Sequence, residues 1–193
     1  MRHGRPVFDH RGWIAPKDMA ARIAGYNEAG IPIEAGADAK IGADGRAYEA
    51  AKVTARDGGC IVASDLPRSV QSARALANGC EVLCESLFRE ADMPYGMWGW
   101  PVLPYRFWCA VFRVAWLCGF SGRAESLAVA QARAGDGSQR LMDLARERGS
   151  VLLVGHGVMN RLIARALLAR GALGPRRLAH GYWSMEVYEF PVN

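Results

Sequence analysis

Two histidines and two arginines stand where the sequence predicts that strands end. Arg2 and His3 open the chain, Arg68 follows a short apolar run, and His156 directly follows another. A phosphoryl group carries its charge on oxygen atoms, which guanidinium groups bind through paired hydrogen bonds. An imidazole nitrogen can attack phosphorus to form a covalent intermediate. These residue types therefore predict a site for phosphoryl chemistry if the fold brings them together.

Glycines follow both histidines, and Gly4 and Gly157 would let the backbone approach a ligand closely. A helix that begins after Gly157 would also direct its positive end at an anion. A metal centre is not expected, because the arginines would repel a cation and because no HxH or HxxxH spacing occurs. The other two histidines, His10 and His180, are interpreted as structural or surface residues.

The elements that must position these residues alternate along the chain. Short apolar runs bounded by glycine or serine predict buried parallel strands at 60–63, 81–84 and 151–154. Apolar residues at helical spacing predict helices at 16–27, 46–56, 67–77, 125–148 with an interruption at 135–137, and a last helix through Arg170 that ends at Gly171. The alternation over 184–190 predicts a final edge strand.

Strands that alternate with helices predict an α/β fold, a three-layer α/β/α sandwich with a mainly parallel central sheet. Ligands of such folds bind beyond the carboxyl ends of the strands. No linker, repeat or low-complexity tract divides the 193 residues, so one domain over 1–193 is expected. Because Met1 directly precedes Arg2, the sequence has no residues for a strand that leads into the turn at 2–4, and a missing upstream strand is one explanation.

The composition indicates a cytoplasmic protein with a small anionic substrate. The formal net charge is +5, but the basic residues are scattered, so no nucleic-acid partner is expected. Five cysteines without a CxxC pair or secretory segment favour reduced thiols, which are interpreted as small core residues. Arg106 and Arg113 interrupt the apolar stretch 101–120, so no membrane span is predicted. The sequence makes no prediction of oligomeric state.

Three motifs in this order resemble the histidine phosphatase superfamily, the phosphoglycerate-mutase-like proteins: RHG at 2–4, SDLPRSVQSA at 64–73 and LLVGHG at 152–157. The resemblance spans most of the chain. It implies a phosphoglycerate-mutase-like fold and a phosphatase without cofactor or metal. It also implies that His3 is the nucleophile and forms a phosphohistidine, that Arg2, Arg68 and His156 bind the phosphoryl group, and that a carboxylate protonates the leaving oxygen.

The carboxylate is expected after the strand at 81–84. The segment FREAD at 88–92 matches the Leu-Arg-Glu-x-Asp pattern that family members often show, so Glu90 is the expected donor and Glu85 the next candidate. The sequence departs from the family at two places, where Arg5 and Asp9 replace a common Glu and Asn. Asp9 would repel a phosphate unless it points away or meets a cation of the substrate.

Two other functions stay open beside the phosphatase. A phosphoglycerate-mutase-type phosphotransferase would use the same phosphohistidine, and a non-catalytic protein would bind a phosphorylated ligand on the same fold. The GHG tripeptide at 155–157 superficially resembles a dinucleotide fingerprint, but Asn160 replaces the third glycine. The resemblance implies that the aromatic-rich insert at 95–120 caps the pocket, and its aromatic content predicts that Trp98 and Trp100 contact a bulky or aromatic substrate. A core helix would instead explain some of these aromatic residues.

Overall fold

The computed structural model describes residues 1–32, 46–77, 79 and 81–190. Its central sheet has three parallel strands in the order β3-β2-β5, which are Val82–Cys84, Cys60–Ala63 and Val151–Val154. All four residues of β2 are buried, as expected for the middle strand of a covered parallel sheet. The three strands coincide with the runs that the sequence predicted.

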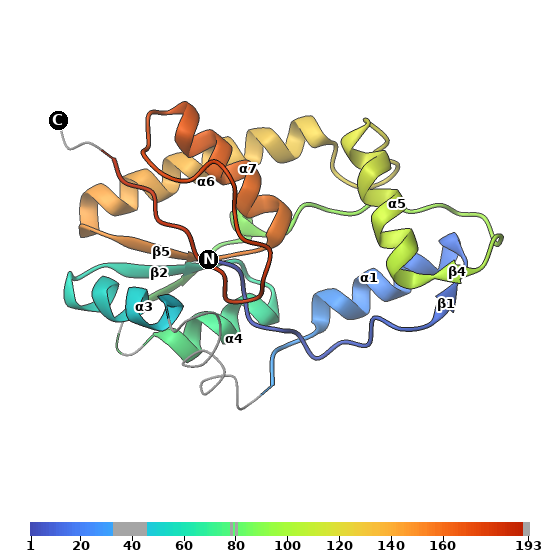
Figure 1. The fold of residues 1–193 in the computed structure, drawn as a ribbon, viewed down its shortest axis with the longest axis horizontal. Helices are drawn as coiled ribbons and strands as arrows, with labels where there is room; N and C mark the ends of the chain where they lie inside the picture. Colours follow the sequence, from blue (N-terminus) through green and yellow to red (C-terminus); the bar gives the residue numbers. More distant parts are fainter. Residues whose placement is uncertain (33–45, 78, 80, 191–193) are drawn as a thin grey trace.

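Helices cover both faces of this sheet (Figure 1). From β2, Cys60 and Val62 pack toward α6 (Leu127–Arg148) and α7 (Gly157–Ala169), whereas Ile61 and Ala63 pack toward α3 (Arg46–Arg56) and α4 (Pro67–Leu76). Neighbouring residues of a strand point to opposite faces, so one short apolar run supplies both cores. The predicted three-layer α/β/α arrangement is confirmed.

A smaller group of elements extends from one end of the sheet (Figure 1). The short strands β1 (Trp13–Ile14) and β4 (Leu103–Pro104) pair antiparallel. The 3-10 turn η1 (Pro16–Asp18), α1 (Met19–Glu28) and α5 (Tyr105–Leu117) complete the group. Its core consists of Met19, Tyr105, Trp108 and Phe112. No helix among the described residues is long and apolar enough to cross a membrane.

The predicted interruption of the helix at 125–148 is wrong. The helix α6 runs unbroken through Gly135 and Gly137. A Cβ at Gly137 would lie 3.3 Å from the ring of Phe88, so this buried glycine lets α6 approach the short 3-10 helix η3 (Ser86–Phe88). Tertiary packing here outweighs the low helix propensity of glycine. The segment 30–45, whose content of glycine, alanine, proline and aspartate predicts a loop, lies largely outside the described residues.

The predicted edge strand at 184–190 is also wrong. This segment forms only an isolated bridge between Glu189 and Leu173, and its start pairs with the first residues of the chain. The N–H of Arg2 donates to the carbonyl of Ser184 at 2.9 Å, and the N–H of Trp183 donates to the carbonyl of Arg2 at 3.1 Å. The alternating pattern therefore gives an extended segment that is held at its two ends.

The cysteines differ from the expectation of five small core residues. Cys60 is buried in the core, but Cys84 and Cys118 are exposed, and Cys109 is partly buried; Cys80 lies outside the described residues. The interpretation as core residues is therefore wrong for Cys84 and Cys118. None of the four described cysteines forms a disulfide with another described residue.

Candidate active site

The first residues of the chain lie beside the end of β5, which places two histidines next to each other. The N–H of Gly155 donates to the carbonyl of Met1 at 2.9 Å, and the N–H of His3 donates to the carbonyl of Gly155 at 3.0 Å. The ring centroids of His3 and His156 are 5.0 Å apart. Both rings are buried, with exposed fractions of 2% and 1%. The site lies beyond the carboxyl ends of the strands, where such folds place ligands.

The surroundings of His3 suit a nucleophile. Its Nδ1 lies 2.6 Å from the carbonyl oxygen of Gly4, and because a carbonyl only accepts, Nδ1 carries the proton. The lone pair of Nε2 is then free to react. Burial lowers the pKa of His3 well below its ordinary value, and the charges of His156, Arg68 and Arg2 lower it further. The ring is therefore neutral at physiological pH.

His156 presents one ring nitrogen to the same space. Its Nε2 lies 2.6 Å from the hydroxyl oxygen of Ser64, whereas its buried Nδ1 has no partner among the described residues. Burial lowers the pKa of His156 well below its ordinary value, and the charges of Arg68 and Arg2 lower this pKa further. If the serine hydroxyl donates to Nε2, Nδ1 keeps its proton and becomes a donor toward a ligand.

Each of the two arginines is held by a hydrogen bond from its Nη1 atom to a backbone carbonyl. Arg68 donates through Nη1 to the carbonyl of Tyr26 at 2.7 Å and lies 4.3 Å from the centre of the Tyr26 ring. Arg2 donates through Nη1 to the carbonyl of His180 at 2.7 Å and lies 4.5 Å from the Tyr182 ring. Within the described part of the chain, both Nε atoms are buried and unpartnered.

Three buried nitrogens thus lack a protein partner around the two histidines: Arg2 Nε, Arg68 Nε and His156 Nδ1. A buried polar group without a partner destabilises the fold by roughly 1–3 kcal/mol. An anion that accepts from all three would remove this penalty. A tetrahedral oxyanion such as a phosphoryl group has the oxygens to do so. No group of three or more metal-ligating side chains occurs in the described ranges.

Glu90 occupies the N-terminus of α7 beside this anion site. Its carboxylate accepts from the backbone N–H groups of Val158 and Met159 at 3.1 and 2.9 Å. A Cβ at Gly157 would lie 3.8 Å from Cζ of Arg2 and 3.9 Å from Oε2 of Glu90, so glycine leaves room between them. The positive end of α7 was expected to face the phosphate directly, but it holds Glu90 instead.

The position of Glu90 favours it over the other two acids of its segment. Glu85 forms an ion pair with Arg140 of α6 at 3.0 Å, on the side of the loop that faces α6. The side chain of Asp92 is exposed. The loop itself is held from two helices, since Arg113 of α5 donates to the carbonyl of Ala91 at 3.0 Å and Arg133 of α6 to that of Arg89 at 2.8 Å.

Asp9 does not contribute its charge to the site. Its side chain is exposed, and its Oδ1 accepts from the backbone N–H of Arg11 at 2.8 Å. This contact closes a turn of the loop that leads away from His3. The repulsion that a carboxylate at this position would cause is therefore absent. Arg5, the other departure from the family pattern, is exposed.

Several residues of the site were not predicted from the sequence. Ser64 sets the hydrogen bonding of His156, and its place directly after β2 was the available signal. Ser72 accepts from the N–H of Gly4 at 2.8 Å and donates to the carbonyl of Arg68 at 2.6 Å, which ties the turn after His3 to α4. Tyr26 and Tyr182, which flank the arginines, carried no signal in the sequence.

The tryptophans of the insert do not line the anion site. The loop that precedes β4 lies at the far end of the smaller group of elements (Figure 1). The Trp98 ring packs near Phe112 at 6.1 Å, and Trp100 is 80% exposed. The expected substrate contact of these two residues is therefore not supported. Tyr105, which also belongs to the insert, stacks its ring on His10 at a centroid distance of 6.1 Å.

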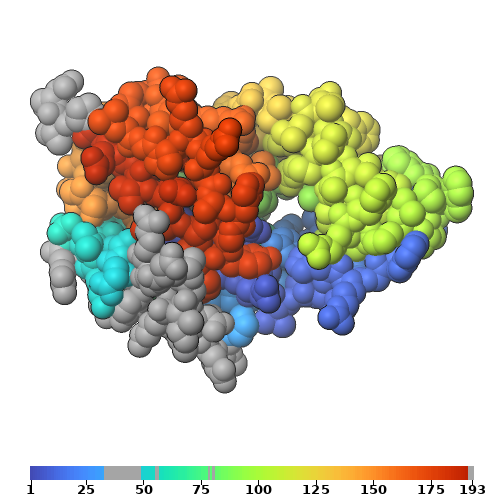
Figure 2. Space-filling model, viewed as in Figure 1, coloured from blue at the N-terminus to red at the C-terminus, as the bar shows by residue number. Residues whose placement is uncertain are grey.

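A cavity of about 1230 Å³ lies between β5, α3, α6, α7 and the C-terminal segment. Arg2 contributes to its wall, but His3, Arg68, Glu90 and His156 do not. Figure 2 shows a different hollow, which separates the C-terminal segment from α5. This hollow lies on the side of the sheet where the smaller group of elements begins.

Solved structures share this fold. Mycobacterial hydrolase 1 superposes with a TM-score of 0.56 at 19% identity, covering 99% of this chain and 94% of that chain. A mycobacterial glucosyl-3-phosphoglycerate phosphatase superposes with a TM-score of 0.55 at 22% sequence identity, covering 87% of this chain and 77% of that chain. A phosphoserine phosphatase variant from Entamoeba histolytica superposes with a TM-score of 0.52 at 17% identity, with the same two coverages. No curated protein matches the sequence.

The family comparison covers nearly the whole chain. The model of the histidine phosphatase superfamily (branch 1) matches residues 1–192, which include all three motifs. The structure brings the histidines of two of these motifs within 5.0 Å of each other, and the charges of Arg2 and Arg68 act on both rings. The sequence match and the shared fold lead to one assignment, and the chain belongs to the histidine phosphatase superfamily.

Proposed function

We propose that this protein is a phosphatase that hydrolyses phosphomonoesters through a phosphohistidine on His3, without a metal ion. One observation carries the proposal. Arg2, Arg68 and His156 each have a buried nitrogen without a partner among the described residues, and all three act on the neutral His3, whose Nε2 carries no proton. The arginines supply the positive charge that a metal ion supplies in other phosphatases.

In the first step, Nε2 of His3 attacks phosphorus. The N–P bond forms while the P–O bond to the alcohol breaks, and the electron pair goes to the leaving oxygen. The carboxyl group of Glu90 gives its proton to that oxygen. The resulting carboxylate is stabilised by the N–H groups of Val158 and Met159, which bond to it in the structure. Arg2, Arg68 and His156 hold the phosphoryl oxygens.

In the second step, water takes the place of the alcohol. The Glu90 carboxylate accepts a proton from water, and the water oxygen attacks phosphorus. The N–P bond breaks and its electron pair returns to Nε2 of His3, so inorganic phosphate leaves and the neutral histidine is restored. Nδ1 keeps its proton, and its hydrogen bond to the Gly4 carbonyl, through both steps, because Nδ1 is not the reacting nitrogen.

The direct test is phosphate release from p-nitrophenyl phosphate, with and without EDTA. The proposal predicts turnover that is unchanged by EDTA. Loss of activity that Mg²⁺ or Zn²⁺ restores would refute the metal-free mechanism. Isomerised 3-phosphoglycerate without net phosphate release would indicate the mutase instead. No turnover of any phosphomonoester, despite binding, would indicate a non-catalytic ligand-binding protein.

A further inference from the structure

A row of three rings leads from the phosphoryl site toward the smaller group of elements. It begins at Tyr26, which lies under the guanidinium of Arg68 at 4.3 Å. The ring of His10 follows at 5.6 Å from Tyr26, and the ring of Tyr105 stacks on His10 at 6.1 Å with an angle of 16°. Phe8 packs behind all three rings at 5.1 to 6.0 Å.

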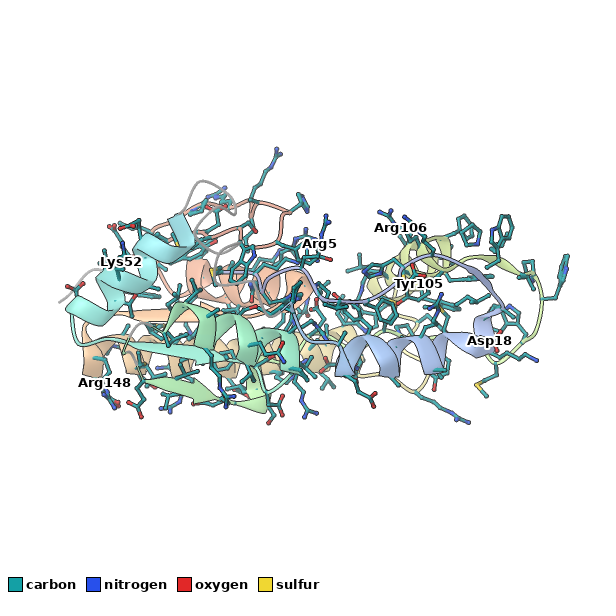
Figure 3. All side chains as sticks on the ribbon, turned by 90° about the horizontal axis from the view of Figure 1, so that it is seen from below. Arg5, Asp18, Lys52, Tyr105, Arg106 and Arg148 are labelled. Carbon is teal, nitrogen blue, oxygen red and sulfur yellow. The ribbon has the colours of Figure 1, made fainter. Side chains whose placement is uncertain are left out.

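Positive charge gathers along this row. Arg106 follows Tyr105 in the first turn of α5 and is exposed, without an ion pair in the described part of the chain. Arg5 is likewise exposed, and its guanidinium lies 5.9 Å from the Tyr182 ring, which borders His3. Figure 3 shows Arg5 at the edge of the sheet-bearing part and Arg106 on the neighbouring end of α5, on the same side of the molecule.

His10 lies where these charges meet. Burial lowers the pKa of His10, and the charges of Arg106, Arg22 and Arg5 act in the same direction. Asp9 is the acid that opposes them, but its Oδ1 already accepts from the N–H of Arg11. Arg22 is engaged by the backbone carbonyls of Asp9 and Arg11. Of these three arginines, Arg106 and Arg5 have no hydrogen bond or ion pair from the guanidinium to another described residue, so they are available to a ligand.

We propose that Arg106, together with His10 and Arg5, forms a second anion site beside the phosphoryl site. The substrate then carries a second acidic group, a carboxylate or another phosphate, at the far end of a body that lies on the rings of Tyr26 and His10. This inference rests on the proposed phosphatase activity, whose substrate it specifies. Under this inference, Arg106 of the insert, and not Trp98 or Trp100, determines which substrates are preferred.

The second acidic group can be tested with phenyl phosphates that differ only at the para position. The probes are 4-carboxyphenyl phosphate, 1,4-phenylene bisphosphate and the neutral 4-(hydroxymethyl)phenyl phosphate. Their dissociation constants are measured by calorimetry on His3→Ala, so that binding is compared without turnover. A charge-assisted hydrogen bond predicts that at least one acidic probe binds about tenfold more tightly than the neutral probe. The carboxylate and bisphosphate arms identify which group is recognised.

Substitution of Arg106 assigns the effect to this residue. Arg106→Ala on the same background should remove the preference for the acidic probe, and Arg106→Lys should restore part of it. Arg148→Ala is the matched control, because it removes an equal charge at the opposite end of the molecule (Figure 3) and should leave the preference unchanged. Circular dichroism of each variant verifies folding.

Two results would overturn the second anion site. One is that the His3→Ala protein with Arg106 intact binds the acidic and neutral probes with equal affinity. The other is an equal loss of affinity for every probe in Arg106→Ala. Hydrolysis of p-nitrophenyl phosphate and of all three probes by the unsubstituted protein is measured in parallel. Absence of phosphate release from p-nitrophenyl phosphate and from all three probes would refute the phosphatase, whereas the calorimetric comparison decides the second anion site in either case.

Discussion

The Nδ1 atom of His3 and the carbonyl oxygen of its chain neighbour Gly4 lie 2.6 Å apart. This bond orients the ring and leaves Nε2 unprotonated. It depends on a close approach, because a Cβ at Gly4 would lie 2.4 Å from a ring carbon of Trp183. The orientation of the nucleophile is thus tied to a glycine that packs against the C-terminal segment.

Gly4→Ala should therefore disturb both the fold and the reaction. The ring of Trp183 or the turn must shift, which costs on the order of 1–3 kcal/mol. We expect a lower melting temperature and a loss of kcat of at least about tenfold, since the Nδ1 bond moves with the turn. Gly135→Ala in α6 is the control, because the nearest atom to its added methyl lies 3.8 Å away. Wild-type kcat in Gly4→Ala would contradict this role.

Ser64→Ala should weaken the anion site without removing any charge. The variant loses the hydroxyl that lies 2.6 Å from Nε2 of His156, so the proton of that ring is no longer fixed on Nδ1. We expect kcat/KM for p-nitrophenyl phosphate to fall about tenfold, as for the loss of a buried hydrogen bond to a reacting group. Ser86→Ala, on the exposed 3-10 turn, serves as the control. An unchanged kcat/KM would show that Ser64 has no part in the reaction.

Glu90→Gln should slow substrates according to their leaving groups. A poor leaving alcohol needs the proton that Glu90 supplies, whereas p-nitrophenolate does not. We expect kcat/KM, which reports the steps through phosphorylation of His3 and not the hydrolysis of the intermediate, to fall roughly 100-fold for an alkyl phosphate and much less for p-nitrophenyl phosphate. Glu85→Gln, which removes the partner of Arg140, should change kcat/KM of both substrates equally. An equal loss of kcat/KM for both substrates in the Glu90 variant would exclude it as the acid.

Acid should destabilise the protein through its buried histidines. The pKa values of His3 and His156 are lowered in the fold, chiefly by burial, so below about pH 6.5 the unfolded chain binds protons that the folded chain does not. Stability is therefore retained above that pH and lost as the pH falls. Each histidine contributes up to about 1.4 kcal/mol per pH unit to the slope.

Urea unfolding between pH 7.5 and 5.5 measures this dependence. His156→Gln should have a shallower slope than the wild type over that range. His180→Gln removes an exposed ring and controls for the substitution itself. A wild-type free energy of unfolding that rises as the pH falls would contradict the lowered pKa values.

The sequence predicted the parts of this protein that rest on local patterns. The apolar runs of β2 and β5 were identified because buried parallel strands are continuous in hydrophobicity. Their carboxyl ends then predicted where the histidines converge. The continuity of α6 was missed because glycine is a poor helix former, and its packing against Phe88 is a tertiary contact that no local pattern reveals.

The charged residues proposed for the anion site stand in sequence motifs, whereas the two tyrosines that flank the arginines do not. Arg68 and His156 stand in motifs, whereas Tyr26 reaches Arg68 across 42 positions of the chain through its carbonyl and its ring. The tryptophans of the insert were misplaced for a similar reason. Composition indicated an aromatic wall, but chain geometry carries Trp98 and its loop away from the sheet and brings Tyr105 toward His10 instead.

The central claim is the covalent intermediate on His3, and trapping it tests the account most directly. Protein quenched during turnover of a ³²P-labelled phosphomonoester should carry label on the peptide that contains residue 3. Because a phosphoramidate is hydrolysed by acid but not by alkali, that label should be acid-labile and alkali-stable, and it should be absent from His3→Ala together with turnover. Full activity of His3→Ala, or label at another residue, would contradict the mechanism.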